Sequence, residues 1–254
     1  RCMIWEQGSL HLDLRKLGLS RRVVGQIIRV GLPAGFQGVV FSLSNVVIQS
    51  ALNSFDDAVL VAGSSASANI EGFVYVSMNA FYQAAITFVG QNYGAAKCDR
   101  VDKAACQCVG FAVVFGLVLG NLAYLFGAPL AGIYAPGEPE VIQQALVRML
   151  YICCPYFICG VMDALVGVLR GLGSSVIPMV VSIIGACGLR LLWVAVVFPV
   201  YRTPASLYLS YPITWTVTGF FHFLFLMAVV RKRAFAKVRQ DGPAYLAAEG
   251  RHPE

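Results

Sequence analysis

The sequence predicts an all-α, polytopic membrane protein with six transmembrane helices. Of its 254 residues, 58% are hydrophobic and only 13% are charged, and the mean hydropathy is +0.70. A soluble domain carries about 25% charged residues, so most of the surface of this chain does not face water. A transmembrane helix needs roughly 20 mainly apolar residues, and six such helices with short connections fill the chain.

Six apolar stretches divide the chain into spans separated by polar segments. We expect the spans at residues 32–52, 69–93, 104–134, 145–169, 176–200 and 206–230. Residues 1–30 then form a basic linker that includes a short amphipathic helix at the membrane interface. Residues 31–233 form the six-helix transmembrane lobe, and residues 234–254 form a polar cytoplasmic tail. The segment from Asp56 to Ala68 is expected to be a loop, and Pro33 is expected in the first turn of the first span.

The basic residues alternate between the two sides of the predicted membrane protein. Six precede the first span, none follows it, three follow the second span and none follows the third; one follows the fourth, one the fifth and six the last. By the positive-inside rule, both termini are expected in the cytoplasm and the protein in the cell membrane. Topology thus accounts for the net charge of +6, and with no basic face on offer we expect no nucleic-acid partner.

The sequence lacks the common signatures of enzymes. It contains no HExxH, no GxSxG, no Walker A loop and no GxGxxG motif after a strand, so neither an enzymatic activity nor a cofactor is predicted. The eight cysteines lack the paired spacing of a zinc site and are expected to be small apolar residues inside helices. The chain starts at Arg1, and its first residues lack the apolar core of a signal peptide; we expect it to begin within a longer protein.

Four ionisable residues stand out inside the predicted spans, where such groups are costly and indicate function. Asp163 and His222 lie roughly 10 and 13 Å from the cytoplasmic ends of their spans, at 1.5 Å per residue, and could face one another. Glu71 and Arg190 are similarly matched toward the outside. For Glu71, Arg190 and His222 a purely structural role is an open alternative. Asp163 is surrounded by apolar residues, so its carboxyl needs a partner, a cation or a proton, and we predict that it couples transport to an ion.

Amide and aromatic side chains on the first two spans are expected to line a cavity. Asn45 and Gln49 are spaced i, i+4, as are Asn79 and Gln83, so each pair shares a helix face. These faces should point to the bundle interior or to a water-filled cavity, although they could also serve only to link helices. The aromatic residues that could offer stacking or cation–π surface to a substrate are Phe73, Phe81 and Tyr82.

Three segments resemble a known family of transporters. They are Ile28-Arg29-Val30-Gly31-Leu32-Pro33-Ala34-Gly35, then Asn69-Ile70-Glu71-Gly72 through to Gly90-Gln91-Asn92-Tyr93-Gly94-Ala95, and Gly167-Val168-Leu169-Arg170-Gly171-Leu172-Gly173 with Pro178-Met179 after it. In order and spacing they resemble the C-terminal half of a multidrug and toxic compound extrusion (MATE) transporter, over roughly residues 15–235.

The resemblance implies half of a twelve-helix antiporter built from two six-helix lobes. Such a protein exports small organic, often cationic, compounds against inward H⁺ or Na⁺, and its missing partner here is the N-terminal lobe. Asp163 falls where some members carry an ion-linked carboxylate. The first span lacks the Glu that some members have, which favours H⁺, and Gly173-Ser174-Ser175-Val176-Ile177-Pro178 departs from the usual family sequence. The alternatives are a flippase for a lipid-linked glycan, which would need a basic cavity, and a non-transporting truncated membrane protein.

Overall fold

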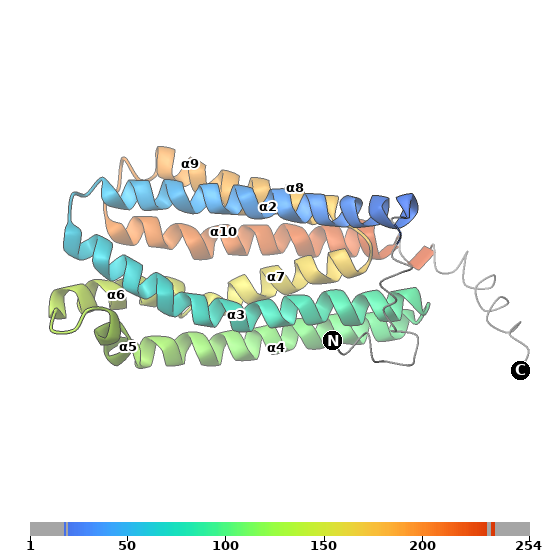
Figure 1. The fold of residues 1–254 in the computed structure, drawn as a ribbon, viewed down its shortest axis with the longest axis horizontal. Helices are drawn as coiled ribbons and strands as arrows, with labels where there is room; N and C mark the ends of the chain where they lie inside the picture. Colours follow the sequence, from blue (N-terminus) through green and yellow to red (C-terminus); the bar gives the residue numbers. More distant parts are fainter. Residues whose placement is uncertain (1–17, 19, 233–234, 237–254) are drawn as a thin grey trace, which may run out of the picture.

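The computed structural model describes residues 18, 20–232 and 235–236, and the regular elements of this part are all helices (Figure 1). The elements are α2 (Arg21–Asn53), α3 (Ala58–Gly94), α4 (Cys98–Leu125), α5 (Gly127–Tyr134), α6 (Pro139–Ile152), α7 (Tyr156–Gly171), α8 (Val176–Ser182), η2 (Ile183–Gly188), α9 (Leu189–Val196), α10 (Pro204–Phe225) and η3 (Leu226–Val230). Five stretches of these described residues are long and apolar enough to cross a membrane, and the bent pair α6–α7 makes a sixth. The predicted six-helix lobe is confirmed.

The helices pack in two groups that share α10. The helix α3 packs against α4, α6 and α7, while α2 packs against α8, η2 and α9. Figure 1 shows α10 running between these groups, and it contacts both α7 and η2. The start of α2, the end of α10 and the junction between α7 and α8 all lie at one end of the bundle, which we call the terminal end.

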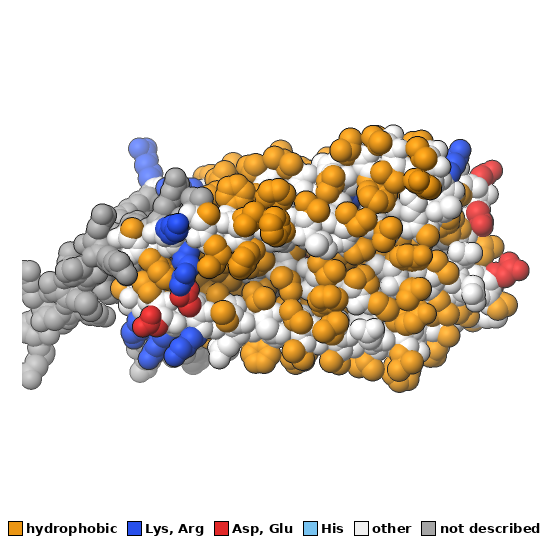
Figure 2. Space-filling view, turned by 180° about the vertical axis from the view of Figure 1, so that it is seen from behind, with side chains coloured by type: hydrophobic (Ala, Val, Ile, Leu, Met, Phe, Trp, Pro, Cys, Tyr) orange, Lys and Arg blue, Asp and Glu red, His pale blue; other side chains and the backbone are white. Residues whose placement is uncertain are grey.

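The surface matches a membrane environment. Figure 2 shows a broad apolar belt across the middle of this face, with most Lys and Arg side chains at the terminal end, where some acidic side chains accompany them, and mainly acidic side chains at the opposite end. Large apolar side chains such as Leu32, Val76 and Ile133 are exposed within the belt. Exposed apolar surface on this scale is incompatible with water and is the expected outer surface of a polytopic membrane protein.

Two of the expected helix boundaries are wrong. The segment 58–68, expected to be a loop, forms the first turns of α3, because the Asp57 side chain caps the helix by accepting hydrogen bonds from the Val59 and Leu60 amides at 2.9 and 3.1 Å. The first span also starts earlier, since residues 21–30 are continuous with it in α2. Pro33 therefore lies inside a helix rather than in its first turn. Residues 1–17 and 237–254 lie outside the described residues, so the expected linker and tail remain predictions there.

The third and fourth spans are interrupted rather than straight. α4 ends at Leu125 and α5 starts at Gly127, two residues before Pro129, whose ring nitrogen cannot donate to a preceding carbonyl. α6 and α7 meet at an angle of 48°. Pro155 lies in this break and likewise cannot continue the hydrogen-bond ladder. The bend directs α7 across the middle of the bundle (Figure 1), and Asp163 lies on this helix.

Glycines allow α3, α4, α6 and α7 to approach closely. At Gly63 an added Cβ would lie 2.6 Å from the Val141 carbonyl oxygen of α6, and at Gly116 it would lie 2.6 Å from the Phe157 Cα of α7. At Gly120 it would overlap the Cys153 carbonyl oxygen. Small residues at crossings are typical of membrane helix packing, where dispersion contacts replace the hydrophobic driving force.

We predict that Gly120→Ala destabilises the bundle. The new methyl group has no room against the Cys153 carbonyl, and such overpacking costs about 1–3 kcal/mol. The measurement is the melting temperature of the detergent-solubilised protein. Gly110→Ala is the matched control on the same helix, because nothing lies within 4 Å of its Cβ position. A melting temperature for Gly120→Ala equal to that of the control would contradict the close approach of α4 to the α6–α7 break.

Candidate functional site

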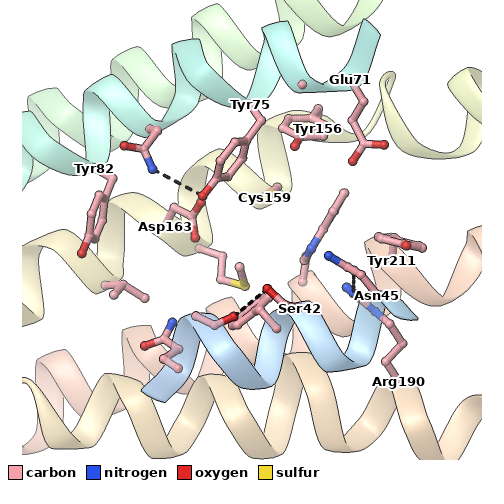
Figure 3. A pocket seen from close by; sticks show the side chains of 18 of the residues that line it. Ser42, Asn45, Glu71, Tyr75, Tyr82, Tyr156, Cys159, Asp163, Arg190 and Tyr211 are labelled. Atoms are coloured by element: carbon pink, nitrogen blue, oxygen red, sulfur yellow. Dashed lines mark hydrogen bonds between the residues drawn. The ribbon is translucent and has the colours of Figure 1, made fainter. Parts of the chain in front are cut away.

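A cavity of about 640 Å³ lies between α2 and the helices α3, α7, α9 and α10 (Figure 3). The predicted residues that line it are Asn45, Gln49, Glu71, Asn79, Tyr82, Asp163 and Arg190. Several lining residues, among them Ser42, Asn45 and Tyr75, are exposed. The described part of the chain therefore builds one wall of the cavity and leaves another side open.

Four of the predicted residues do not line the cavity: Phe73, Phe81, Gln83 and His222. Phe81 packs against Phe115 of α4, with ring centroids 5.2 Å apart. Gln83 is exposed and does not line the cavity, although it shares an approximate face with Asn79. Phe73 is 72% exposed on the outer surface. The i, i+4 spacing places Asn79 on the cavity side of α3 as expected, but Gln83, one turn further along, is exposed outside the cavity.

His222 does not face Asp163 as expected. It is fully buried between α10 and α8, where its Nε2 lies 3.3 Å from the Pro178 carbonyl oxygen and 3.4 Å from the Ser182 hydroxyl. It does not line the cavity. Similar depth did not place the two side chains together, because α10 turns His222 toward α8 instead of α7.

Asp163 lies near the middle of the cavity, on the α7 segment behind the bend (Figure 3). Figure 3 shows it beside Tyr75, whose hydroxyl is within 3.4 Å of the Asn79 side-chain nitrogen. Among the residues that the structure describes, no side chain forms a hydrogen bond or an ion pair with its carboxyl group. A carboxyl in this position is available to a proton, a cation or a substrate.

Glu71 is paired with Arg148, not with Arg190 as the depth estimate predicted. The Arg148 Nη2 lies 3.0 Å from the Glu71 Oε2, and the two side chains are 9% and 15% exposed. Arg148 Nη1 also donates to the Ser64 hydroxyl at 2.6 Å. Because α3 begins at Ala58, Glu71 is several turns inside the helix and not at its end. This pair joins α3 to α6 beside the cavity.

The guanidinium group of Arg190 is surrounded by neutral groups. Its nitrogens lie 3.4 Å from the Asn45 Oδ1 and 3.4 Å from the Thr214 hydroxyl. It also lies 4.1 Å from the centre of the Tyr211 ring. The residue is only 2% exposed. It belongs to the cavity wall, but its expected acidic partner is engaged elsewhere.

Arg170 was expected in a cytoplasmic loop and instead reaches into the cavity. It donates to the Gln37 Oε1 of α2 at 2.8 Å and to the Tyr82 hydroxyl of α3. Arg148 and Arg170 are charged residues of the cavity that were not predicted from the sequence. Arg148 lies inside the expected fourth span, and that position was the available signal.

The fold and the cavity define the class of protein. It is a six-helix lobe of a polytopic membrane protein, with a cavity that polar side chains line and that is open on one side. The family profile named MatE matches residues 33–196. The chain belongs to the MatE family, whose members are transporters.

The relatives in sequence are described as probable multidrug resistance proteins and are longer than this chain. The chain is 26% identical over 172 residues to the probable multidrug resistance protein NorM of Thermotoga maritima, covering 65% of this chain and 35% of that protein. It is 25% identical over 197 residues to the protein of the same description from Synechocystis, covering 74% and 42%. The chain therefore spans less than half the length of these relatives.

Solved structures show the same fold. A MATE structure in complex with MaL6 superimposes with a TM-score of 0.77 at 17% identity, over 90% of this chain and 50% of that one. A transporter of the MOP superfamily from Pyrococcus furiosus, described as having a binding pocket of reverse polarity, gives a TM-score of 0.77 at 18% identity with the same coverage. Half of each of these chains corresponds to the six-helix lobe.

We predict that the Glu71–Arg148 pair is a large stabilising contact. Glu71→Gln leaves the Arg148 charge buried without a counter-charge, which should lower the free energy of unfolding by about 3–5 kcal/mol. The double variant Glu71→Gln, Arg148→Met should recover much of that loss, because it removes both charges. The measurement is the melting temperature in detergent.

The matched control for this prediction is the exposed pair Arg231–Asp102, whose side chains are 39% and 42% exposed. Asp102→Asn should cost only about 0–1 kcal/mol, since water screens the pair. Equal shifts for Glu71→Gln and Asp102→Asn would show that the Glu71–Arg148 pair is not held in a low-dielectric site.

Proposed function

We propose that this chain is the C-terminal lobe of a secondary active exporter of small organic, often cationic, compounds, coupled to inward H⁺ or Na⁺. The observation that carries the proposal is the cavity that holds the unpaired Asp163 carboxyl and stays open on one side. Membership of a transporter family and relatives described as multidrug resistance proteins support it. A second, N-terminal six-helix lobe would close the open side.

The coupling ion acts at Asp163 in this proposal. A carboxyl group free of protein partners can take up H⁺ or a cation, and binding there changes the charge that a substrate meets. H⁺ is favoured over Na⁺, because the first span lacks the Glu that some members of the family carry. Glu71 stabilises the bundle through its ion pair with Arg148, and His222 is a buried residue that packs α10 against α8.

The organic substrate lies against the aromatic and amide wall of the cavity. Tyr82 contributes a ring next to Arg170, and Asn45 and Asn79 contribute hydrogen-bonding groups. A cationic amine is held by Asp163 when the carboxyl is ionised. Uptake of a proton cancels that charge and releases the amine, which gives exchange of H⁺ for a cation.

The second candidate function is that of a glycan flippase, which would need a basic cavity to bind a diphosphate. Three guanidinium groups line this cavity, from Arg148, Arg170 and Arg190. Arg148 is neutralised by Glu71, however, and Arg170 is engaged by Gln37 and Tyr82. Among the described residues, Arg190 is then the cavity cation with the longest polar contacts, at 3.4 Å to neutral groups. With Arg148 paired and Arg170 engaged, efflux of organic compounds is favoured over diphosphate transport. A non-transporting truncated membrane protein would show no efflux in the test below.

We predict that Asp163→Asn abolishes ion-coupled efflux. In cells that express the intact gene, ethidium efflux should fall at least tenfold and lose its response to the proton gradient, because the amide cannot take up a proton. Asp102→Asn is the matched control, since it removes a carboxyl outside the cavity. Efflux is measured under separate H⁺ and Na⁺ gradients. Wild-type, gradient-dependent efflux by the Asp163→Asn protein would remove this residue from the mechanism.

The orientation in the cell membrane is also a proposal. The basic terminal end faces the cytoplasm, so both termini are cytoplasmic, and the acidic end faces outward. Figure 2 shows most Lys and Arg side chains at the terminal end and mainly acidic side chains at the opposite end. Lys97 and Arg100, at the start of α4, and Glu138 and Glu140, at the start of α6, are exposed.

We predict that a reporter fused after Glu254 stays in the cytoplasm. Green fluorescent protein there should fluoresce, and alkaline phosphatase there should be inactive. Alkaline phosphatase inserted after Gly137, in the turn between α5 and α6, should be active because that turn faces outward. The reverse pattern of the two phosphatase activities would refute the orientation.

A further inference from the structure

Toward the terminal end of the bundle, the cavity stops at side chains from three different helices. In that direction Tyr82 is the last lining residue of α3, and Arg170 is the last lining residue of α7. On α2, Gln37 lies at the same end of the lining, with only Ala34 further along. Figure 3 shows Tyr82 at one end of the cavity and Arg190 toward the other, with Asp163 between them. These side chains therefore stand between the cavity and the terminal end.

Arg170 joins the three helices at this level. Its Nη2 donates to the Gln37 Oε1 at 2.8 Å, and its Nη1 donates to the Tyr82 hydroxyl. The guanidinium carbon also lies 5.6 Å from the centre of the Tyr82 ring. Because Arg170 precedes Gly171, where α7 ends, its side chain leaves the last turn of the helix and crosses the end of the cavity. We call Gln37, Arg170 and Tyr82 the Arg170 bridge.

The backbones of α2 and α7 are not packed together behind the bridge. The helix α2 packs against α8, η2 and α9, whereas α7 packs against α3, α4 and α10. In the described part of the chain, the hydrogen bond from Arg170 to Gln37 is the one that joins α7 to α2. Gly35 and Gly38, on either side of Gln37, have nothing within 4 Å of their Cβ positions. Side chains, and not close helix packing, thus hold this end of the cavity shut.

The chemistry of the bridge suits a contact that breaks and forms again. Both acceptors of Arg170 are neutral, and an arginine is bound more weakly by a neutral acceptor than by a carboxylate. The buried pair of Glu71 and Arg148 is the contrasting case, since it joins α3 to α6 through opposite charges. That pair lies within a closely packed group of helices, whereas the bridge connects α2 to another group across the cavity.

We propose that the Arg170 bridge is the cytoplasmic gate of the cavity. While the bridge is formed, the cavity is closed toward the cytoplasm; when it breaks, α2 moves away from α7 and the cavity opens on that side. The proposal rests on the proposed export function and orientation, and it assigns a role to Arg170 that neither contains. Arg170 controls access to the cavity and is not needed to take up the coupling ion.

The test follows the access of a reagent to the cavity from the cytoplasmic side. Ser42→Cys supplies the reporter thiol, because Ser42 lines the cavity on the far side of Gln37 from the terminal end and is exposed. Inside-out membrane vesicles that carry the product of the intact gene are treated with an uncharged, impermeant sugar maleimide. Peptide mass spectrometry measures the labelling rate at position 42 and separates it from labelling of native cysteines such as Cys159 in the same cavity.

Two changes at position 37 should shift the labelling rate in opposite directions. Gln37→Ala removes an acceptor of Arg170 and should raise the rate about tenfold, the change expected for one hydrogen bond to a charged group. Gln37→Glu gives Arg170 a carboxylate partner and should lower both the labelling rate and ethidium efflux. Arg170→Gln should raise the labelling rate as Gln37→Ala does. Arg100→Gln is the matched control, because it removes an exposed positive charge at the start of α4, outside the cavity.

Equal labelling rates for the Ser42→Cys parent, Gln37→Ala and Gln37→Glu overturn the gate, and this comparison decides the matter even if Arg170→Gln does not fold. A rise in labelling that appears only in right-side-out vesicles overturns its placement on the cytoplasmic side. Ethidium efflux by the wild-type protein is measured alongside. Intact efflux with unchanged labelling rejects the gate and leaves the export function standing, whereas bridge-dependent labelling without any efflux rejects the export function and supports the closure.

Discussion

A bundle that lies in hydrocarbon must hold its polar side chains inside, and this constraint organises the whole lobe. The outer surface is a belt of exposed apolar residues, so each charged group within the spans has to find a partner or a cavity. Glu71 and Arg148 satisfy one another across α3 and α6. The other charged residues of the cavity wall, Asp163, Arg170 and Arg190, form no ion pair among the described residues. They lie there because a charged side chain that faced the lipid would be far more costly.

Two irregular spans complete this arrangement: the bent pair α6–α7 and the span from α8 to α9 with its π turn. The break at Pro155 turns α7 across the bundle and carries Asp163 to its centre. The π turn before α9 and its contact with α10 carry Arg190 to the same cavity. Straight helices would pack as well against lipid, but they would not bring these two side chains to a common space. The irregular backbone at mid-depth therefore belongs to the site, and the regular helices α3, α4 and α10 support it.

Hydropathy and charge alternation predicted the number of spans, because both properties follow from the bilayer and not from details of packing. The partners of the charged residues could not be predicted in the same way. Depth along a helix can be estimated from residue number, but rotation about its axis cannot, and this is why Glu71 meets Arg148 and His222 meets Pro178. The start of α3 was misplaced because the capping side chain of Asp57 starts the helix ahead of Gly and Ser residues that are common in loops. Arg170 looked like a loop residue, although its length lets it reach back to Gln37.

The π turn in η2 has a consequence for how this cavity can change over time. A π turn closes its hydrogen bond one residue later than an α turn, so it holds one residue more. One residue more in a regular helix would rotate everything after it by about 100°, whereas the π turn takes up that residue locally, so α9 keeps the phase that places Arg190 in the cavity wall. The charge of the cavity thus depends on the phase of a helix as well as on its side chains. A single codon inserted or deleted in a regular stretch of this helix can therefore change the charge of the cavity as strongly as a substitution in its wall.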